Sequence, residues 1–296
     1  MIEGDLLARV ERLVAARRPF VHATVVRAAP PTSVRPGDAA LVLADGTIEG
    51  FVGGVCAQAS VRLHAARALE TGEPLLLRLV PEPAPSTADD PGPDGTVTAH
   101  NPCLSGGALE IFLEPCLPAP RVLILGDAPV AGALAELGPR VGLSVDAGDP
   151  DGSDLALVVA SHGRDEERVL ERGLREGVPY VGLVASRRRG AAVVEALDVD
   201  DALRGRVRTP AGLDIGAYTA EEIALSILAE IVSVRRRRLA LPAPAPATAV
   251  DPVCGMEILV TEATPRLEHD GACVYFCCAG CRTAFGADRV RHGAGE

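Results

Sequence analysis

Two cysteines of the chain lie close to glycine pairs, in two well-separated segments. Cys56 follows Gly53–Gly54, and Cys103 precedes Gly106–Gly107. A glycine pair lets an anionic group approach backbone amides, and a helix N-terminus lowers the pKa of a nearby thiol. A single cysteine beside glycine is most often a small buried hydrophobe. Because the arrangement occurs twice, a role in packing alone is less favoured, and Cys56 is a candidate thiolate.

A second group of cysteines lies near the end of the sequence, where Cys254, Cys277 and Cys281 have the spacing C-x22-C-x3-C. A segment of roughly 45 residues has a small apolar core, so a bound metal would stabilise it. Three thiolates and a fourth ligand suit a soft, tetrahedral ion such as zinc or copper. The candidates for the fourth ligand are Cys278, which we include in the predicted site, Cys273 and His269. The alternative is a set of buried cysteines that bind no metal.

The middle of the chain has an incomplete dinucleotide-binding motif. Where G-x-G-x-x-G requires three glycines, the sequence has Gly126, Ala128 and Ala131. Asp146 lies where a ribose-binding acid is expected, 20 residues after Gly126 (146 − 126). His162 follows a predicted strand, at the edge where open α/β sheets bind ligands. We predict that Gly126, Asp146 and His162 line a crevice, and the damaged motif disfavours hydride transfer with NAD(P).

The elements that position these residues divide into three folded parts. We predict that residues 1–117 form an α+β domain in which residues 81–95 are a mobile loop. Residues 118–238 alternate strands and helices, which predicts a parallel, Rossmann-like sheet in an α/β protein; its strands are expected at 121–125, 141–145, 155–160 and 180–185. Residues 239–250 are rich in alanine and proline, which indicates a semi-rigid linker. This linker would lead to a compact tail formed by residues 251–296.

The helix that ends the second part has a clear start. Thr219 and Glu222 have the spacing of a capping box, and Ile223, Ile227 and Ile231 form an apolar stripe at helical spacing. The surrounding sequence, PAGLDIGA followed by EEIALSILAEI, closely resembles the signature that closes proteins of the XdhC/CoxI family. The tail, with DPVCGM and VYFCCAGC, resembles the small metal-binding YHS domains.

The resemblance to XdhC/CoxI proteins implies a function. These proteins are accessory factors for molybdenum hydroxylases such as xanthine dehydrogenase and carbon monoxide dehydrogenase. The resemblance implies that the two glycine–cysteine segments bind the molybdenum cofactor (molybdopterin). It further implies sulfuration of the cofactor with a cysteine desulfurase, insertion into an apo molybdenum hydroxylase, and a homodimer. The protein would then be a cofactor chaperone rather than an enzyme. The alternatives are a heavy-metal sensor or metallochaperone acting through the tail, and an NAD(P)-dependent oxidoreductase.

Composition excludes several other classes of protein. The formal charge of −11, without a basic stripe, disfavours binding to nucleic acid. No stretch reaches the ~18 apolar residues of a membrane span, and the N-terminus is unlike a signal peptide. The 8 cysteines suit reduced thiols or metal ligands better than a disulfide framework. We therefore expect a cytoplasmic protein.

Overall fold

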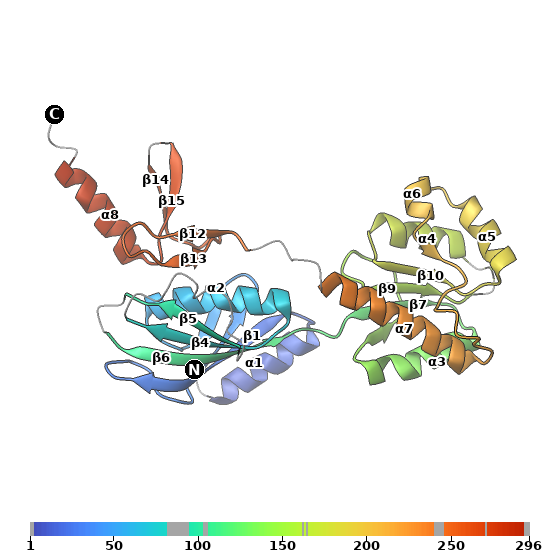
Figure 1. Ribbon diagram of the computed structural model, residues 1–296, viewed down its shortest axis with the longest axis horizontal. Helices are drawn as coiled ribbons and strands as arrows, with labels where there is room; N and C mark the ends of the chain where they lie inside the picture. Colours follow the sequence, from blue (N-terminus) through green and yellow to red (C-terminus); the bar gives the residue numbers. More distant parts are fainter. Residues whose placement is uncertain are drawn as a thin grey trace. The chain divides into compact units, whose positions relative to one another are not determined.

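The computed structural model describes residues 3–81, 95–102, 106–161, 163, 165–239, 246–269 and 271–292. The chain forms two compact units, residues 1–118 together with 243–296, and residues 119–242 (Figure 1). The tail and the N-terminal part, which the sequence predicts to be separated by a linker, thus belong to one unit. Cys103, His162 and most of the loop expected at 81–95 lie outside the described residues. Among the described residues, no helix combines the length and apolar character that a membrane span requires.

The first unit is built on a six-stranded sheet with the order β3-β2-β1-β6-β4-β5. Its elements are α1 (Glu3–Ala15), β1 (Phe20–Ala29), β2 (Ala39–Leu43), β3 (Ile48–Gly50), α2 (Val55–Thr71), β4 (Leu75–Val80), β5 (Thr96–His100) and β6 (Ala108–Cys116). All neighbours pair antiparallel except β4 and β5. Alternate residues of β1 divide between two cores: Val21 and Ala23 pack with the buried face of α2, and Phe20 packs with α1.

The second unit has a parallel sheet with the order β11-β10-β9-β7-β8, which confirms the predicted Rossmann-like fold. The strands are β7 (Arg121–Leu125), β8 (Ser144–Asp146), β9 (Ala156–Val159), β10 (Tyr180–Leu183) and β11 (Val207–Arg208). The helices are α3 (Pro129–Leu137), α4 (Glu166–Arg175), α5 (Arg187–Ala196), α6 (Asp201–Arg204) and α7 (Ala220–Leu239). The prediction that a strand starts at residue 141 is wrong, because residues 138–141 form a 3-10 turn and Gly142 is left-handed, so β8 begins at Ser144.

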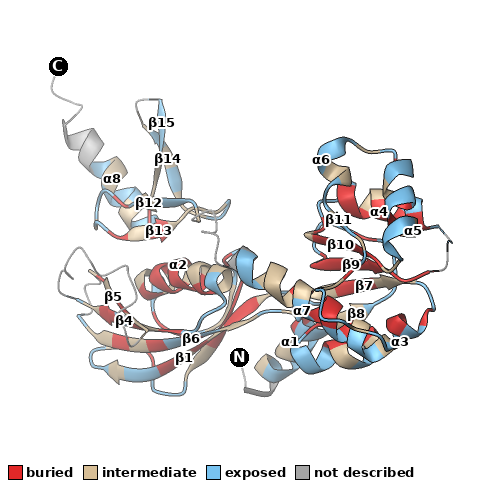
Figure 2. Cartoon of the chain, turned by 45° about the vertical axis from the view of Figure 1, so that its right-hand side comes forward, coloured by how far each residue is buried: buried red, intermediate tan, exposed pale blue. Residues whose placement is uncertain are grey.

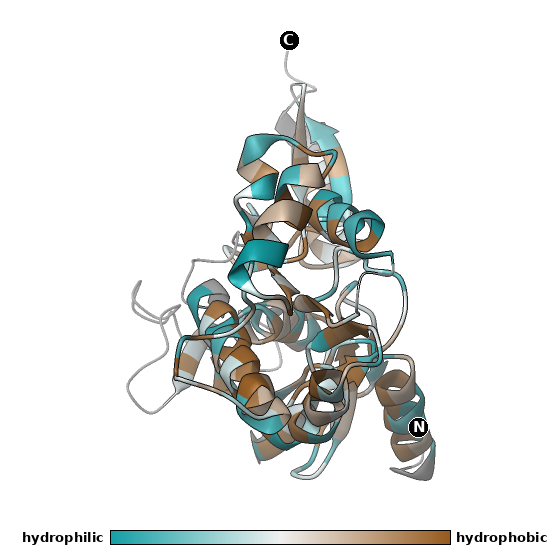
Figure 3. Ribbon diagram, turned by 90° about the vertical axis from the view of Figure 1, so that its right-hand side faces the viewer, coloured by the Kyte–Doolittle hydropathy of each residue, from teal (hydrophilic) through white to brown (hydrophobic). Residues whose placement is uncertain are grey.

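Helices cover both faces of this parallel sheet, so its central strands are buried on both sides (Figure 2). Val122 packs with α3 and α7, whereas its neighbour Leu123 packs with α4. This explains why the strands read as continuous apolar runs rather than as alternating ones. In Figure 3 the helices of this unit carry hydrophobic residues on one side and hydrophilic residues on the other.

Helix α7 starts as predicted. Thr219 Oγ1 accepts a hydrogen bond from Glu222 N at 3.2 Å, and the Glu222 carboxylate accepts one from Thr219 N at 3.0 Å. Further along, the Glu230 carboxylate accepts hydrogen bonds from the Tyr180 hydroxyl at 2.8 Å and from Gly212 N at 3.0 Å. The glycine-rich loop before α7 is thereby tied to both the helix and strand β10.

The tail consists of two hairpin-like strand pairs and one helix: β12 (Thr248–Val250), β13 (Glu257–Leu259), β14 (Arg266–His269), β15 (Ala272–Tyr275) and α8 (Ala279–His292). Residues 248–250, expected in the linker, pair with β13 instead. Strand β13 lies against α2 of the sheet domain, by which we mean residues 1–118 with their six-stranded sheet (Figure 1). An ion pair with an N–O distance of 3.0 Å joins Arg67 of α2 to Glu257 of β13. Met256 and Ile258 pack beside it on Ala59 of α2.

Candidate functional site

The two glycine segments meet at one cavity of about 480 Å³ in the first unit. Its lining residues come from the loop after β1, the start of α2 and the segment between β5 and β6: Pro31, Thr32, Ser33, Gly54, Ala57, Asn101, Gly107 and Leu109. Gly54 is the N-cap of α2, with φ −67° and ψ 176°, and no side chain caps the helix. Because the first amides of a helix have no partner within it, this end of α2 offers donors for an anionic group.

Two of the glycines are required by close approach of other atoms. A Cβ at Gly107 would lie 2.1 Å from the Pro31 carbonyl oxygen. Gly53 has φ +139°, and a Cβ there would lie 2.8 Å from that of Ala57. Both glycines therefore shape the cavity wall through packing. At Gly54, by contrast, a Cβ would meet no atom within 4 Å.

Asn101 supplies an unused acceptor among the residues that line this cavity. The residue is 5% exposed, and its backbone is held by a hydrogen bond from Asn101 N to Val80 O at 2.8 Å. Its side-chain oxygen Oδ1 is buried and has no hydrogen-bond partner among the described residues. A buried acceptor without a donor costs about 1–3 kcal/mol, so a ligand with N–H groups would relieve this penalty. No sequence motif marks Asn101 as a cavity residue, because its burial depends on pairing of β5 with β4.

The predicted thiols do not both line this cavity. Cys103 lies outside the described residues, and Cys56 is the second residue of α2. Successive residues of a helix point about 100° apart. Ala57 lines the cavity, whereas Cys56 packs against the tail, with Ala59, Met256 and Cys277. The convergence of Cys56 and Cys103 on one metal thus stays a prediction.

Three of the predicted tail ligands lie together. The Sγ atoms of Cys254 and Cys277 are 3.6 Å apart, as are those of Cys277 and Cys281. With Asp251, these residues place four ligand atoms within 4.8 Å of one another. A tetrahedral site with Zn–S bonds of about 2.3 Å has sulfur–sulfur edges of about 3.8 Å. The three thiols therefore have the spacing of a thiolate metal site, and we call them the tail thiol cluster.

Asp251, which the sequence analysis did not consider as a ligand, organises the tail thiol cluster. It is fully buried, and its carboxylate accepts hydrogen bonds from Val253 N and Cys277 N, both at 2.8 Å. Burial acts to raise the pKa of this carboxyl, but the backbone amides of Cys277 and Val253 outweigh it and lower the pKa. An ionised carboxylate thus holds the loop of Cys254 against the turn of Cys277.

The cluster thiols favour their protonated form when no cation is present. A hydrogen bond with Cys56, together with burial and the nearby Asp251, raises the pKa of Cys277. Burial raises the pKa of Cys254, and raises that of Cys281 to about 12. A bound cation would reverse this preference, because thiolates are the metal-binding form and binding releases their protons.

The other predicted candidates for the fourth ligand are placed differently. Cys278 precedes α8, and its Sγ accepts a hydrogen bond from Cys281 N at 3.4 Å, so it acts as a helix cap. Cys273 is exposed on β15, and the His269 ring lies edge-on to Phe285 at 5.3 Å. The compact group of four ligand atoms found among the described residues includes none of these three.

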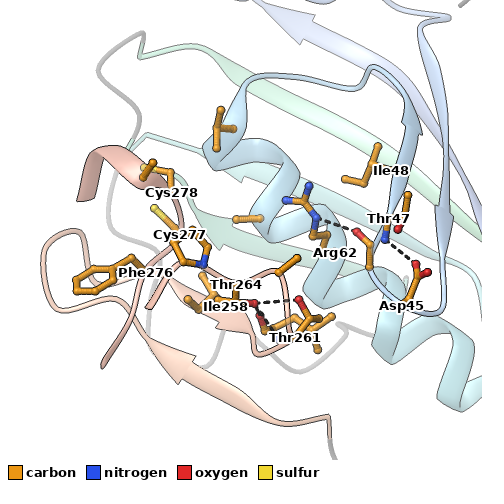
Figure 4. A pocket seen from close by; sticks show the side chains of 17 residues that line it. Asp45, Thr47, Ile48, Arg62, Ile258, Thr261, Thr264, Phe276, Cys277 and Cys278 are labelled. Carbon is orange, nitrogen blue, oxygen red and sulfur yellow. Dashed lines mark hydrogen bonds between the residues drawn. The ribbon is translucent and has the colours of Figure 1, made fainter. Parts of the chain in front are cut away.

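A second cavity, of about 430 Å³, reaches the tail thiol cluster from the side of the β2–β3 hairpin (Figure 4). Cys277 and Cys278 lie at one end of the labelled side chains, Asp45 and Ile48 lie at the other, and Arg62 lies between them. Arg62 Nε donates a hydrogen bond to Gly46 O at 2.9 Å, which holds the hairpin turn against α2. This cavity opens onto Cys277, one of the three cluster thiols.

The crevice residues of the parallel sheet have structural partners. A Cβ at Gly126 would lie 2.3 Å from the Ala160 carbonyl oxygen, so this glycine permits close packing of the ends of β7 and β9. Asp146 accepts a hydrogen bond from the Ser144 hydroxyl at 2.8 Å. With Ala128 as the N-cap of α3 and Pro129 as its first residue, this helix end has few amides for a phosphate. These features give no support to an NAD(P) site.

His162 lies outside the described residues, but the residues on either side of it are firmly held. The Glu166 carboxylate accepts hydrogen bonds from the Ser161 hydroxyl and from Gly163 N, both at 3.0 Å. Glu166 is 1% exposed and forms an ion pair with Arg189 of α5. A buried acid therefore fixes the backbone on both sides of His162 at the carboxyl edge of the sheet.

Comparison with known protein families finds matches to two parts of the chain. A family described as XdhC and CoxI matches residues 13–79, and the XdhC Rossmann domain matches residues 122–231. The chain belongs to the XdhC and CoxI family. The first matched range contains Gly53, Gly54 and Cys56, so the start of α2 lies within the region that defines the family. Both ranges end before the tail, whose likeness to YHS domains stays a prediction.

Two curated proteins are similar to this chain in sequence. The Escherichia coli K12 protein YqeB, described as uncharacterized, is 26% identical over 264 residues, which cover 78% of this chain and 46% of YqeB. A Bacillus subtilis protein described as a probable component of xanthine dehydrogenase is 25% identical over 157 residues, or 43% of this chain and 46% of that protein. The chain thus spans about half the length of the curated relatives it matches.

A crystal structure described as a xanthine dehydrogenase from Bacillus halodurans is also similar. It aligns with 16% identity and a TM-score of 0.38, over 80% of this chain and 98% of that one.

Proposed function

We propose that this XdhC/CoxI protein is an accessory factor that binds the molybdenum cofactor, supports its sulfuration and inserts it into a molybdenum hydroxylase of the xanthine dehydrogenase or carbon monoxide dehydrogenase type. Family membership supports the general role. The observation that carries the proposal is the cavity where Gly54 and Gly107 meet beside the N-terminus of α2.

Several groups around the cavity support this proposal. When bound, the cofactor brings a soft metal, a pterin ring with N–H groups and a phosphate. The first amides of α2 would bind the phosphate, and the unpartnered Oδ1 of Asn101 would accept a hydrogen bond from the ring. Gly54, beside which a Cβ would meet no atom within 4 Å, leaves room for the ligand at the start of α2. Cys103, which precedes Gly106 and Gly107 in the sequence, is the proposed soft ligand, because thiolates bind such metals well.

The proposed partners follow from the family. They are an apo molybdenum hydroxylase as the client and a cysteine desulfurase as the sulfur donor, with the protein acting as a cytoplasmic homodimer. The residues that line the cavity favour binding over catalysis. Asn101 supplies a neutral acceptor, and α2 supplies backbone donors. The protein would therefore hold and transfer its cargo rather than transform a substrate.

The test is the cofactor content of the full-length protein purified from a host that makes molybdopterin. We expect pterin and molybdenum to copurify with the wild type, and at least a tenfold lower content in Asn101→Leu, which removes the acceptor and adds an apolar group. The matched control is Asn101→Asp, which retains an acceptor of the same size. A wild-type protein without pterin and molybdenum, or equal content in all three proteins, would refute the proposal.

A second function is favoured by the tail thiol cluster, in which Cys277 Sγ lies 3.6 Å from the sulfur atoms of both Cys254 and Cys281 and Cys277 lines the second cavity. In this alternative the protein is a metal sensor or metallochaperone that acts through its tail. The two proposals predict different results in an assay of client hydroxylase activation. The metallochaperone proposal predicts loss of activation in Cys277→Ser and normal activation in Asn101→Leu. The cofactor proposal predicts loss in Asn101→Leu.

A further inference from the structure

Cys56 of α2 contacts the tail thiol cluster. Its side chain packs with Ala59 of α2 and with Met256, Ile258 and Cys277 of the tail. The interaction of its thiol with that of Cys277 is the largest cause of the raised pKa of Cys277. Because the two residues belong to one compact unit but to distant parts of the sequence, this contact joins the sheet domain to the tail at a chemically reactive group.

The tail by itself provides an incomplete soft site. It contributes three thiols with sulfur–sulfur distances near a tetrahedral edge, together with the Asp251 carboxylate. Both oxygens of that carboxylate already accept backbone amides, those of Val253 and Cys277. A soft ion prefers a fourth sulfur to an oxygen that is engaged in this way.

We propose that Cys56 is the fourth ligand of a zinc-type metal site that spans α2 and the tail, with Cys254, Cys277 and Cys281 as the other three. On binding, the four thiols release four protons to water and form four metal–sulfur bonds, with no change in oxidation state. Asp251 remains outside the first coordination sphere. There it orients Cys277 and the loop of Cys254, as outer-shell partners of metal ligands commonly do.

The surrounding contacts fit a shared site. The Arg67–Glu257 ion pair and the packing of Ile258 on Ala59 hold the tail against α2 on the same side as Cys56. The four ligand atoms that lie within 4.8 Å of one another do not include that of Cys56, so the Cys56 side chain must turn toward the cluster to bring its sulfur into the coordination sphere. Metal binding would therefore fasten the tail to the sheet domain. This inference extends the proposed metal site of the tail and does not depend on whether the glycine-lined cavity binds a pterin.

The test counts the sulfur ligands of Zn²⁺ by X-ray absorption spectroscopy on the full-length protein. We expect four sulfurs in the wild type, and three sulfurs and one lighter atom in Cys56→Ser. The matched control is Cys116→Ser, which removes a half-buried thiol that packs beneath α1 and should leave four sulfurs. Competition with a chelator should show at least a tenfold weaker Zn²⁺ affinity for Cys56→Ser and an unchanged affinity for Cys116→Ser.

Three results would overturn the proposal. The first is a wild-type site with three sulfurs and one oxygen, which would assign the fourth position to Asp251. The second is a Cys56→Ser protein that keeps four sulfurs while Cys278→Ser loses one. The third is a wild-type protein that binds no Zn²⁺. Pterin content, measured on the same preparations, reports separately on the cofactor proposal, so failure of one proposal can be told from failure of the other.

Discussion

Gly107 and Gly54 line the same cavity but tolerate a side chain very differently. A Cβ at Gly107 would lie 2.1 Å from the Pro31 carbonyl oxygen, which belongs to the backbone and cannot rotate away. Gly54 has space for a Cβ and a φ of −67°, which any residue can adopt. At the residue scale, Gly107 is needed for the fold of the cavity wall, whereas Gly54 leaves room for a ligand.

This difference predicts the stability of two alanine variants. Gly107→Ala should lower the free energy of unfolding by about 1–3 kcal/mol, because the added methyl group overpacks the site. Gly54→Ala should lower it by less than about 1 kcal/mol, since it changes only the N-cap preference. Urea denaturation of both variants measures these values. Equal losses in the two variants would contradict the assignment.

Glu166 predicts how the stability of the second unit depends on pH. Burial acts to raise its pKa, but hydrogen bonds from Arg189, Gly163 and Ser161 outweigh this and lower it. A carboxyl whose folded pKa lies below its unfolded value stabilises the fold above the unfolded pKa, and this contribution disappears as the pH falls through the folded pKa. The wild type should therefore lose stability below about pH 4.

Glu166→Gln tests this assignment. At neutral pH the substitution should cost about 1–3 kcal/mol, because it leaves partners of a buried acid without their charged acceptor. Its stability should change less than that of the wild type as the pH falls below the ordinary range of a glutamate. Thermal unfolding at a series of pH values measures both effects, and parallel curves for the two proteins would show that Glu166 does not carry the dependence.

At the element scale, helix α7 connects the loop before it to the parallel sheet. Its start is fixed locally by Thr219 and Glu222, and its middle is fixed by Glu230, which binds Tyr180 and Gly212. The capping box was predictable because its partners lie three residues apart. The Glu230 contacts were not, because Tyr180 lies in a different element and reaches the helix only after the sheet has formed.

Thr219→Ala should destabilise the second unit by about 1 kcal/mol through loss of the N-cap hydrogen bond, whereas Thr219→Ser should retain most of the stability. Chemical denaturation followed by far-UV circular dichroism compares the two variants. If the alanine and serine proteins unfold at the same denaturant concentration, the threonine hydroxyl contributes nothing to the helix start.

At the scale of the whole molecule, the main departure from the sequence analysis concerns the tail. The alternating α/β pattern of residues 119–242 was predictable, because it arises from local hydrophobic periodicity. The cysteine spacing also indicated the tail thiol cluster. The docking of β13 on α2 was not predictable, because it depends on contacts such as Arg67–Glu257, which lie 190 residues apart in the sequence. For the same reason the sequence could not indicate that Cys56 reaches Cys277.

Removal of metal should weaken the packing of the tail against α2. A ligand present at 100 times its Kd stabilises the state that binds it by about 2.7 kcal/mol. We expect Zn²⁺ to raise the midpoint of thermal unfolding of the wild type and a chelator to lower it. Cys277→Ser should respond to neither treatment. A chelator that shifts both proteins equally would show that the effect arises outside the tail thiol cluster.

The first turn of α2 has Cys56 on the side of the tail and Ala57 on the side of the glycine-lined cavity. A shift of this turn on binding one ligand would move the residue that faces the other. If binding of one proposed ligand changes the affinity for the other, thermodynamic reciprocity requires that the second ligand change the affinity for the first by the same factor. Zinc supply in the cell would then set how readily this protein accepts or releases its pterin cargo.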